Sequence, residues 1–253
     1  MTPGDVEKAV ASTAGVDRKR VRLAIRDLVR LGELSYTYVY GASFLERSFD
    51  RPVRLSKRIV IKPPQTPYQP RPGEVVLNIA AGAAFGNGAH PTTCLALRAL
   101  DHIFGGNRYI ERKAPLKGLD VGTGTGILAI ALAKLGVQKV VGIDIDPCAV
   151  SEATHNVSLN GLAKQALVTD TPLEKLASQF FVIVANIAQP TLRRMAPFLS
   201  ARTEEKGFLI LSGFLESVSK DLGETYAKYG LRLVREETER GWACITLCKV
   251  GSE

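Results

Sequence analysis

Three glycines alternate in the segment from Leu119 to Gly126 (LDVGTGTG), which continues a short apolar run near the middle of the chain. Gly122 and Gly124 carry no Cβ, so the backbone there can turn tightly and pass close to a ligand. The apolar residues from Ile127 onward predict a helix whose first amide groups point towards such a ligand. The segment therefore predicts a binding loop between a strand and a helix, and an ordinary structural turn is the alternative.

The glycine spacing distinguishes between two adenosine-bearing cofactors. A nicotinamide dinucleotide loop has the pattern GxGxxG, which would need glycine at position 127, where this chain has Ile127. An acidic residue followed by GxGxG resembles instead the loop that binds S-adenosylmethionine. We therefore expect Asp120, Gly122 and Gly124 to take part in binding S-adenosylmethionine.

A second acidic residue stands where a ribose-binding group is needed. The apolar run Val140–Ile143 ends at Asp144, one helix and one strand after Gly122. A carboxylate at the tip of the second strand can accept hydrogen bonds from both ribose hydroxyls. Such a carboxylate recognises a ribose, which both adenosine-bearing cofactors have, and it does not indicate the methionine part of S-adenosylmethionine. Asp146 is more typical of a helix cap, because Pro147 follows it.

An asparagine ends a third apolar run, Val182-Ile183-Val184-Ala185-Asn186. Ligands bind at the carboxyl edge of an open α/β sheet, so we expect Asn186 where methyl donor and acceptor meet. Its carbonyl could orient an incoming amine, or its amide could hold the donor's carboxylate; a cap of the next helix is the alternative. Ile187-Ala188 replaces the two prolines of the N-P-P-[YF] motif that is typical of methylation on planar amide or base nitrogens.

A fourth segment, FGNGAHPTT (85–93), precedes the first sheet strand. Together with DVGTGTGILAI (120–130), GIDIDP (142–147), ANI (185–187) and LSG (211–213), in this order, it makes residues 57–249 resemble the PrmA family, the lysine methyltransferases of ribosomal protein L11.

The resemblance implies cofactor contacts for Thr93, Gly122, Asp144 and Asn186, with Asp170 near the adenine amino group. His90 is expected to shape the loop over the cofactor. Asn87 and Ala89 stand where the family usually has threonine.

Strand-like and helical patterns alternate from about Glu74 onward, which predicts a parallel sheet covered by helices. The end differs, because Leu231–Glu237 and Trp242–Lys249 flank a turn and predict an antiparallel hairpin. The fold class is thus α/β: a Rossmann-like, seven-stranded class I methyltransferase sheet with a C-terminal hairpin. We assign residues 76–253 to this catalytic domain and residues 41–75, rich in proline, to a connector with one strand.

Residues 1–40 predict a small winged-helix-like α+β module. Residues 1–62 hold 13 Lys and Arg against 7 Asp and Glu, so most of the chain's net charge of +8 is N-terminal. Arg18, Arg22 and Arg26 form a basic ridge opposite the apolar stripe, which predicts contact with RNA or another acidic surface; a solvated face is the alternative. The PrmA family has a ferredoxin-like N-terminal domain that recognises the ribosomal protein, and residues 1–40 do not resemble it.

Four hypotheses about function follow. The first is a protein methyltransferase acting on a lysine or N-terminal amine, with a ribosomal protein as the substrate that the resemblance implies and Asn186 at the reacting groups. The second is an RNA methyltransferase that uses the basic module, the third a small-molecule amine methyltransferase, and the fourth a non-catalytic sensor of S-adenosylmethionine. The four cysteines form no CxxC pair, no secretion signal or membrane span is evident, and we expect a reduced, cytoplasmic protein without a metal site.

Overall fold

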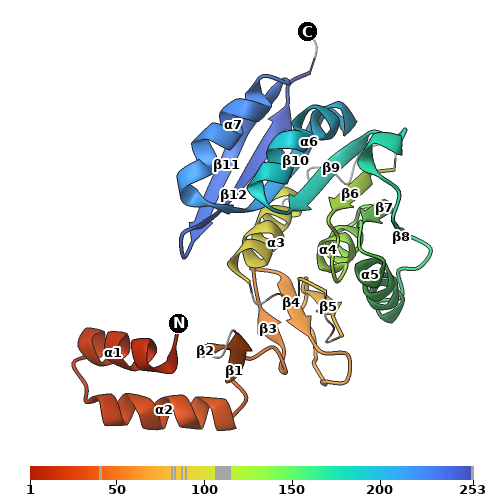
Figure 1. Ribbon diagram of the computed structural model, residues 1–253. Helices are drawn as coiled ribbons and strands as arrows, with labels where there is room; N and C mark the ends of the chain where they lie inside the picture. Colours follow the sequence, from red (N-terminus) through yellow and green to blue (C-terminus); the bar gives the residue numbers. More distant parts are fainter. Residues whose placement is uncertain are drawn as a thin grey trace. The chain divides into compact units, whose positions relative to one another are not determined.

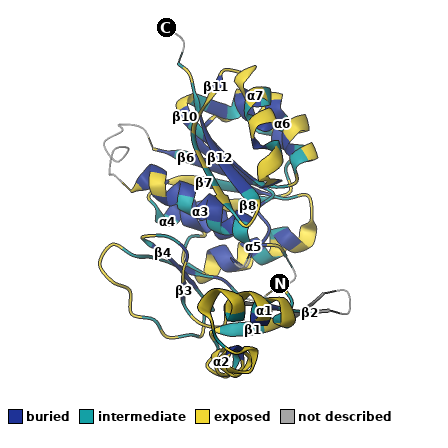
Figure 2. Cartoon of the chain, turned by 90° about the vertical axis from the view of Figure 1, so that its left-hand side faces the viewer, coloured by how far each residue is buried: buried dark blue, intermediate teal, exposed yellow. Residues whose placement is uncertain are grey.

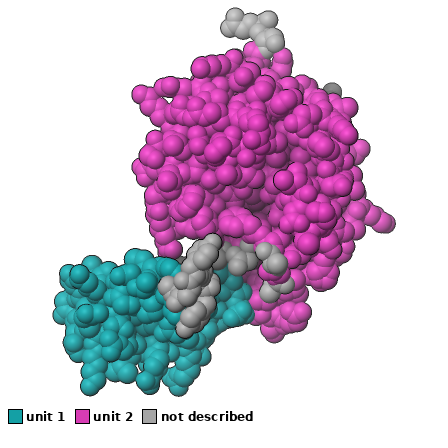
Figure 3. Space-filling view, viewed as in Figure 1, with its two compact units in different colours: residues 1–53 teal, residues 54–253 magenta. Residues whose placement is uncertain are grey.

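The computed structural model describes residues 1–251 except 40–41, 81, 83, 87, 89 and 106–114. It divides into two compact units, Met1–Val53 and Arg54–Glu253 (Figure 3). The first unit thus extends past residue 40, because a strand after that position pairs with the strand before it. In the part of the chain that is described, no helix is long and apolar enough to cross a membrane.

The first unit consists of two helices and a hairpin: α1 (Pro3–Ala14), α2 (Arg18–Arg30), β1 (Leu34–Val39) and β2 (Ala42–Arg47). α1 begins at Pro3 because Thr2 and Asp5 form a capping box, and it ends at Gly15, which has a φ of +62°. Val21 and Ile25 of α2 and Leu45 of β2 form a small buried core. Figure 1 shows α1 above α2, with the two helices running in opposite directions and joined by a short turn. The winged-helix interpretation stays a prediction.

Strands β3 (Val53–Arg54), β4 (Ile59–Lys62) and β5 (Val75–Asn78) form a small sheet around the proline-rich segment. Glu74 fixes that segment: it accepts hydrogen bonds from the Tyr68 hydroxyl at 2.6 Å and the Arg71 amide at 3.0 Å, and it pairs with Arg54. The hydrogen bonds from Tyr68 and Arg54 lower the pKa of Glu74 to about 2. The stretch predicted as a connector therefore carries more strands than the one expected.

The seven-stranded α/β sheet predicted from the sequence is confirmed. Its order is β11-β12-β10-β9-β6-β7-β8, with β6 to β10 parallel and β12 antiparallel to both β10 and β11. The strands are β6 (Lys117–Val121), β7 (Lys139–Ile143), β8 (Ala166–Thr169), β9 (Phe180–Asn186), β10 (Thr203–Leu215), β11 (Leu231–Glu239) and β12 (Trp242–Lys249).

Helices cover both faces of this sheet (Figures 1 and 2). α3 (Pro91–Phe104), α4 (Ile127–Lys134) and α5 (Pro147–Leu159) lie on one face, and α6 (Gln189–Arg202) and α7 (Ser219–Ala227) on the other. β9 is buried from Phe180 to Ala185, as expected for a central parallel strand covered on both sides. Because β6, β7, β8 and β9 are parallel, their carboxyl ends meet at one edge of the sheet, where Asp144, Asp170 and Asn186 follow or end their strands.

Candidate functional site

A cavity of about 800 Å³ opens at this edge of the sheet. Five of the residues predicted to bind cofactor line it: Gly122, Gly124, Asp144, Asp170 and Asn186. The other two, Thr93 and Asp120, do not line it and lie behind residues that do. The cavity also takes in Phe85, His90, Ile145, Leu173, Arg194 and Trp242, of which only His90 was singled out from the sequence.

The glycine loop is shaped by contacts within the protein as well as by room for a ligand. Gly122 and Gly124 have φ values of +70° and +53°. A Cβ at position 124 would lie 2.2 Å from the carbonyl oxygen of Phe85, and one at position 122 would lie 2.4 Å from Ile187 Cγ2. Glycine is therefore needed at both positions for the backbone of the loop to lie against its neighbours and still leave the cavity open.

Asp120 binds this loop from the side that faces away from the cavity. Its Oδ2 accepts hydrogen bonds from the Thr123 hydroxyl at 2.7 Å and from the Ala129 amide at 2.9 Å. The carboxyl group is fully buried, and this burial raises the pKa of Asp120 to about 7, with the charge of Asp144 as a smaller cause. The structure thus gives Asp120 a role in positioning the loop, and it does not place the residue on the cavity.

Asp144 faces the cavity with its carboxylate oriented by two backbone amides. Oδ2 accepts a hydrogen bond from the Gly124 amide at 2.9 Å and Oδ1 from the Asp146 amide at 3.0 Å. A carboxylate has about four acceptor positions, so each oxygen can still accept a ribose hydroxyl. Asp146 caps α5 by accepting from the Cys148 amide at 2.9 Å, as its place before Pro147 predicts.

Asn186 presents an oxygen without a partner. Its Nδ2 donates to Thr93 Oγ1 at 3.3 Å, which fixes the orientation of the amide. Its buried Oδ1 receives no hydrogen bond from any of the residues that are described. The alternative that Asn186 caps α6 is not observed, because Ala188 occupies the cap position. A buried acceptor without a donor is costly unless a ligand supplies one, so Oδ1 fits a bound N–H group.

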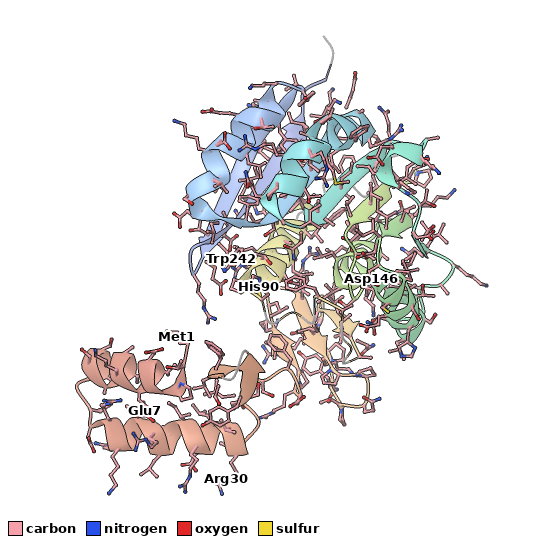
Figure 4. The ribbon with its side chains drawn as sticks, viewed as in Figure 1. Met1, Glu7, Arg30, His90, Asp146 and Trp242 are labelled. Carbon is pink, nitrogen blue, oxygen red and sulfur yellow. The ribbon has the colours of Figure 1, made fainter. Side chains whose placement is uncertain are left out.

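Three aromatic rings line the cavity together with Asn186. The His90 ring lies 4.8 Å from that of Trp242 and 5.4 Å from that of Phe85 (centroid distances), and Figure 4 shows His90 and Trp242 side by side. His90 Nδ1 also accepts from the Thr92 amide at the start of α3. These contacts support the prediction that His90 shapes the loop. The predicted departures at Asn87 and Ala89 lie outside the described residues.

The same cavity offers apolar surfaces beside Asp170. Ile145 is 94% exposed, which is unusual for an isoleucine, and Leu173 lies buried in the wall. A planar base fits between such side chains, with the Asp170 carboxylate at its edge. The glycine cradle, the ribose acceptor Asp144 and the unpartnered Asn186 oxygen therefore fit an adenosyl cofactor. Among the described residues, no cluster of three or more His, Cys, Asp or Glu could hold a metal ion.

The predicted arginine ridge is partly used within the first unit. Arg22 donates from Nε and Nη2 to the two carboxylate oxygens of Glu7, both at 2.8 Å, and Arg18 lies 3.7 Å from the same carboxylate. The Glu7 side chain is only 8% exposed, and Figure 4 shows it between α1 and α2. Arg18 and Arg22 therefore hold α1 against α2, whereas Arg26 is exposed and has no ion pair among the described residues.

Comparisons with known proteins agree with this geometry. The family model of ribosomal protein L11 methyltransferase (PrmA) matches residues 46–250. The ribosomal protein L11 methyltransferase of Geotalea daltonii is 40% identical over 204 residues, which cover 79% of this chain and 65% of that protein. The one from Geobacter metallireducens is 43% identical over 194 residues, covering 77% and 61%. This chain thus spans less than two thirds of the length of both relatives.

Solved structures show the same sheet. A ribosomal protein L11 methylase from Lactobacillus delbrueckii subsp. bulgaricus superposes with a TM-score of 0.69 at 28% identity, covering 79% of this chain and 100% of that one. The magnesium protoporphyrin IX methyltransferase of Synechocystis PCC 6803, solved with bound S-adenosylmethionine, reaches 0.50 at 18% identity, covering 67% and 86%. The family model matches most of the chain, and the matched residues 46–250 include every side chain that lines the cavity. The chain therefore belongs to the ribosomal protein L11 methyltransferase (PrmA) family.

Proposed function

We propose that this chain is an S-adenosylmethionine-dependent methyltransferase that methylates a protein amine, a lysine or an N-terminal amine, with a ribosomal protein as substrate. The observation that carries the proposal is the buried Asn186 oxygen without a donor, in a cavity whose other walls fit the cofactor. The names of the relatives support a ribosomal protein as the acceptor. The motif string of residues 85–213 supports the chemistry.

The chain's own residues bind and align the reactants. S-adenosylmethionine, when bound, supplies a methyl group that is already activated by its sulfonium. Gly122 and Gly124 would leave room for it beside the loop, Asp144 would accept hydrogen bonds from its ribose, and Asp170 would accept one from its adenine amino group. Thr93 acts through Asn186, whose amide orientation it fixes, and Asp120 acts through the glycine loop.

Asn186 then orients the acceptor amine. Its Oδ1 would accept one amine N–H and so direct the nitrogen lone pair towards the bound cofactor, and Trp242, His90 and Phe85, which line the same cavity, would reduce the access of water. Alignment of this kind supplies about 7–11 kcal/mol of the barrier. A free lysine has a pKa of about 10.4, so removing its proton at neutral pH costs about 4–5 kcal/mol, and an apolar surrounding lowers that cost. We therefore assign no general base.

Transfer of label from radioactive S-adenosylmethionine tests the proposal. The substrates are purified ribosomal protein L11 and a cell lysate, each with and without nuclease, and mass spectrometry locates the methyl group. We expect label on a protein amine, insensitive to nuclease. An Asn186→Ala variant should keep cofactor affinity within a few-fold and lose most of kcat, whereas Asn186→Asp should keep part of it. Cofactor binding without transfer to any protein would contradict the proposal and favour the sensor.

One observation favours a second candidate, an RNA methyltransferase: the basic helix α2 lies outside the residues that the family model matches. In that case the label would be lost on nuclease treatment. A small-molecule amine as acceptor would instead place the label in the fraction that passes a dialysis membrane. The missing prolines after Asn186 count against methylation of a base nitrogen, which is why we rank the protein amine first.

A further inference from the structure

The family match does not account for the two helices of the first unit. The matched family region begins at residue 46, after both helices of this unit. Its second helix α2 carries six Lys and Arg side chains and one acidic residue, Asp27. A helix with this excess of positive charge exposes it to solvent unless a partner of negative charge is present.

The structure places five of these six cations in two groups, and the sixth, Arg20, is exposed outside both. Arg18 and Arg22 are turned towards α1 and are bound to Glu7. Lys19, Leu23, Arg26 and Arg30 are all exposed, and their spacing of i, i+4, i+7 and i+11 places them along one side of the helix. We call these four residues the outer face of α2. It lies away from the buried Val21 and Ile25, and it spans about 16 Å at the rise of an α-helix.

The charges of the outer face are available to a partner. Within the described residues, Lys19 and Arg26 have no ion pair. Arg30 lies 3.4 Å from Asp27, and both side chains are more than half exposed, so this pair contributes little and can exchange for another anion. Leu23, 47% exposed, is the one apolar side chain among them. A narrow row of cations with a small apolar contact fits a polyanion with regularly spaced charges.

The helix pair around this face supports a nucleic acid over an acidic protein. α1 and α2 run in opposite directions in Figure 1 and are joined by the three residues Gly15–Asp17, with Gly15 in the left-handed conformation, a turn of the length and composition found in helix-turn-helix units. In such units the second helix enters the major groove of B-DNA, which is about 12 Å wide. Two of the three outer cations are arginines, whose planar guanidinium matches phosphate oxygens better than an ammonium does.

We propose that the outer face of α2 binds the phosphate backbone of a nucleic acid duplex. The site is separate from the cavity of the second unit, and the proposal does not depend on methyl transfer. Three phosphate contacts predict that log K falls with log salt with a slope of about −2.7, so affinity drops about 40-fold between 50 and 200 mM salt. Leu23 contributes apolar contact and no salt dependence.

Fluorescence anisotropy with the full chain tests this. The probes are labelled 20-base-pair duplexes of RNA and of DNA, and labelled polyglutamate as the acidic-protein arm, each across that salt range. The test variant is Lys19→Glu/Arg26→Glu. The matched control is Lys220→Glu/Lys228→Glu, which changes the net charge equally at two exposed lysines at α7 of the second unit.

We expect the control to bind duplex nearly as the wild type does, and the test variant to lose at least tenfold in affinity and most of the salt slope. The duplex bound more tightly, RNA or DNA, identifies the source of the phosphates. Equal losses in both double variants, or polyglutamate bound as tightly as the duplexes, would overturn the proposal. Cofactor affinity, measured by calorimetry, should be the same in all three proteins, so a failed methyltransferase assignment would leave this result standing.

Discussion

The buried carboxyl group of Asp120 should make the stability of the second unit depend on pH, and Asp120→Asn should remove that dependence. Burial raises the pKa of Asp120 from 3.8 to about 7 in the folded chain. Asparagine has nearly the same shape and its oxygen can still accept from Thr123 and Ala129, but it does not titrate. The comparison therefore isolates the proton on this one side chain.

The sign and size follow from proton linkage. Between pH 3.8 and 7 the unfolded chain releases the Asp120 proton and the folded chain retains it, so the folded state binds more protons and stability falls as pH rises. At 1.36 kcal/mol per pKa unit, the wild type should lose about 2 kcal/mol relative to the variant between pH 5 and 7. Well above pH 7 both states are ionised and the difference becomes constant. The amide NH₂ of the variant, buried without an acceptor, adds a cost of about 1–3 kcal/mol that is the same at every pH.

Urea unfolding at pH 5, 6, 7 and 8 measures this difference. Trp242 is the only tryptophan in the chain and belongs to the second unit, so its fluorescence reports the unfolding of the unit that contains Asp120. A Thr123→Val variant removes the hydroxyl that stabilises the charged carboxylate, and it should extend the fall in stability to higher pH. If the free energy of unfolding of the wild type minus that of Asp120→Asn stayed constant from pH 5 to 8, or increased with pH, the reasoning would be refuted.

Three further predictions test the cofactor cradle and the first unit. Asp144→Asn should weaken S-adenosylmethionine binding at least tenfold in calorimetry, because it removes the charge that strengthens the ribose hydrogen bonds; unchanged affinity would remove Asp144 from the site. Gly124→Ala should lower both cofactor affinity and stability, whereas Gly161→Ala, at a similar φ of +71° but with open space around it, should cost only the backbone strain and leave affinity unchanged. Arg22→Gln should speed hydrogen exchange in α1 by releasing Glu7, and Arg26→Gln should not. Equal exchange rates in both variants would contradict the conclusion that Arg22 holds α1 against α2.

The sequence was sufficient to predict the parallel sheet, its C-terminal hairpin and the side chains at the strand ends. Alternating strand and helix patterns allow few topologies, and residues that directly follow parallel strands must gather at one edge. That is why Asp144 and Asn186, far apart along the chain, could be assigned to one cavity from the sequence, whereas Asp170 was implied by the family resemblance.

Contacts between elements could not be predicted in this way. Trp242 faces the cavity because the hairpin folds back beside α3, and nothing near it in the sequence indicates His90 as its neighbour. Asp120 and Thr93 belong to the motifs of the site but do not line the cavity, because the spacing along a strand or a helix does not say which of its faces a ligand meets. The pairing of Arg22 with Glu7 likewise needs the turn between the two helices to be known.

One helix, α5, binds both the glycine loop and the segment that leads to Phe85. Asn156 of α5 accepts a hydrogen bond from the Ala80 amide at 2.9 Å and donates one to the Thr125 carbonyl at 2.9 Å, so it binds both the segment that leads to the Phe85 loop and the glycine loop. Glu152, one turn earlier, accepts from the Ala84 amide at 3.0 Å. Asn156 is only 2% exposed, and a lost partner would leave a buried polar group that costs about 1–3 kcal/mol. The glycine cradle and the loop that carries Phe85 are therefore not independent: a shift of either breaks a buried bond to the same helix.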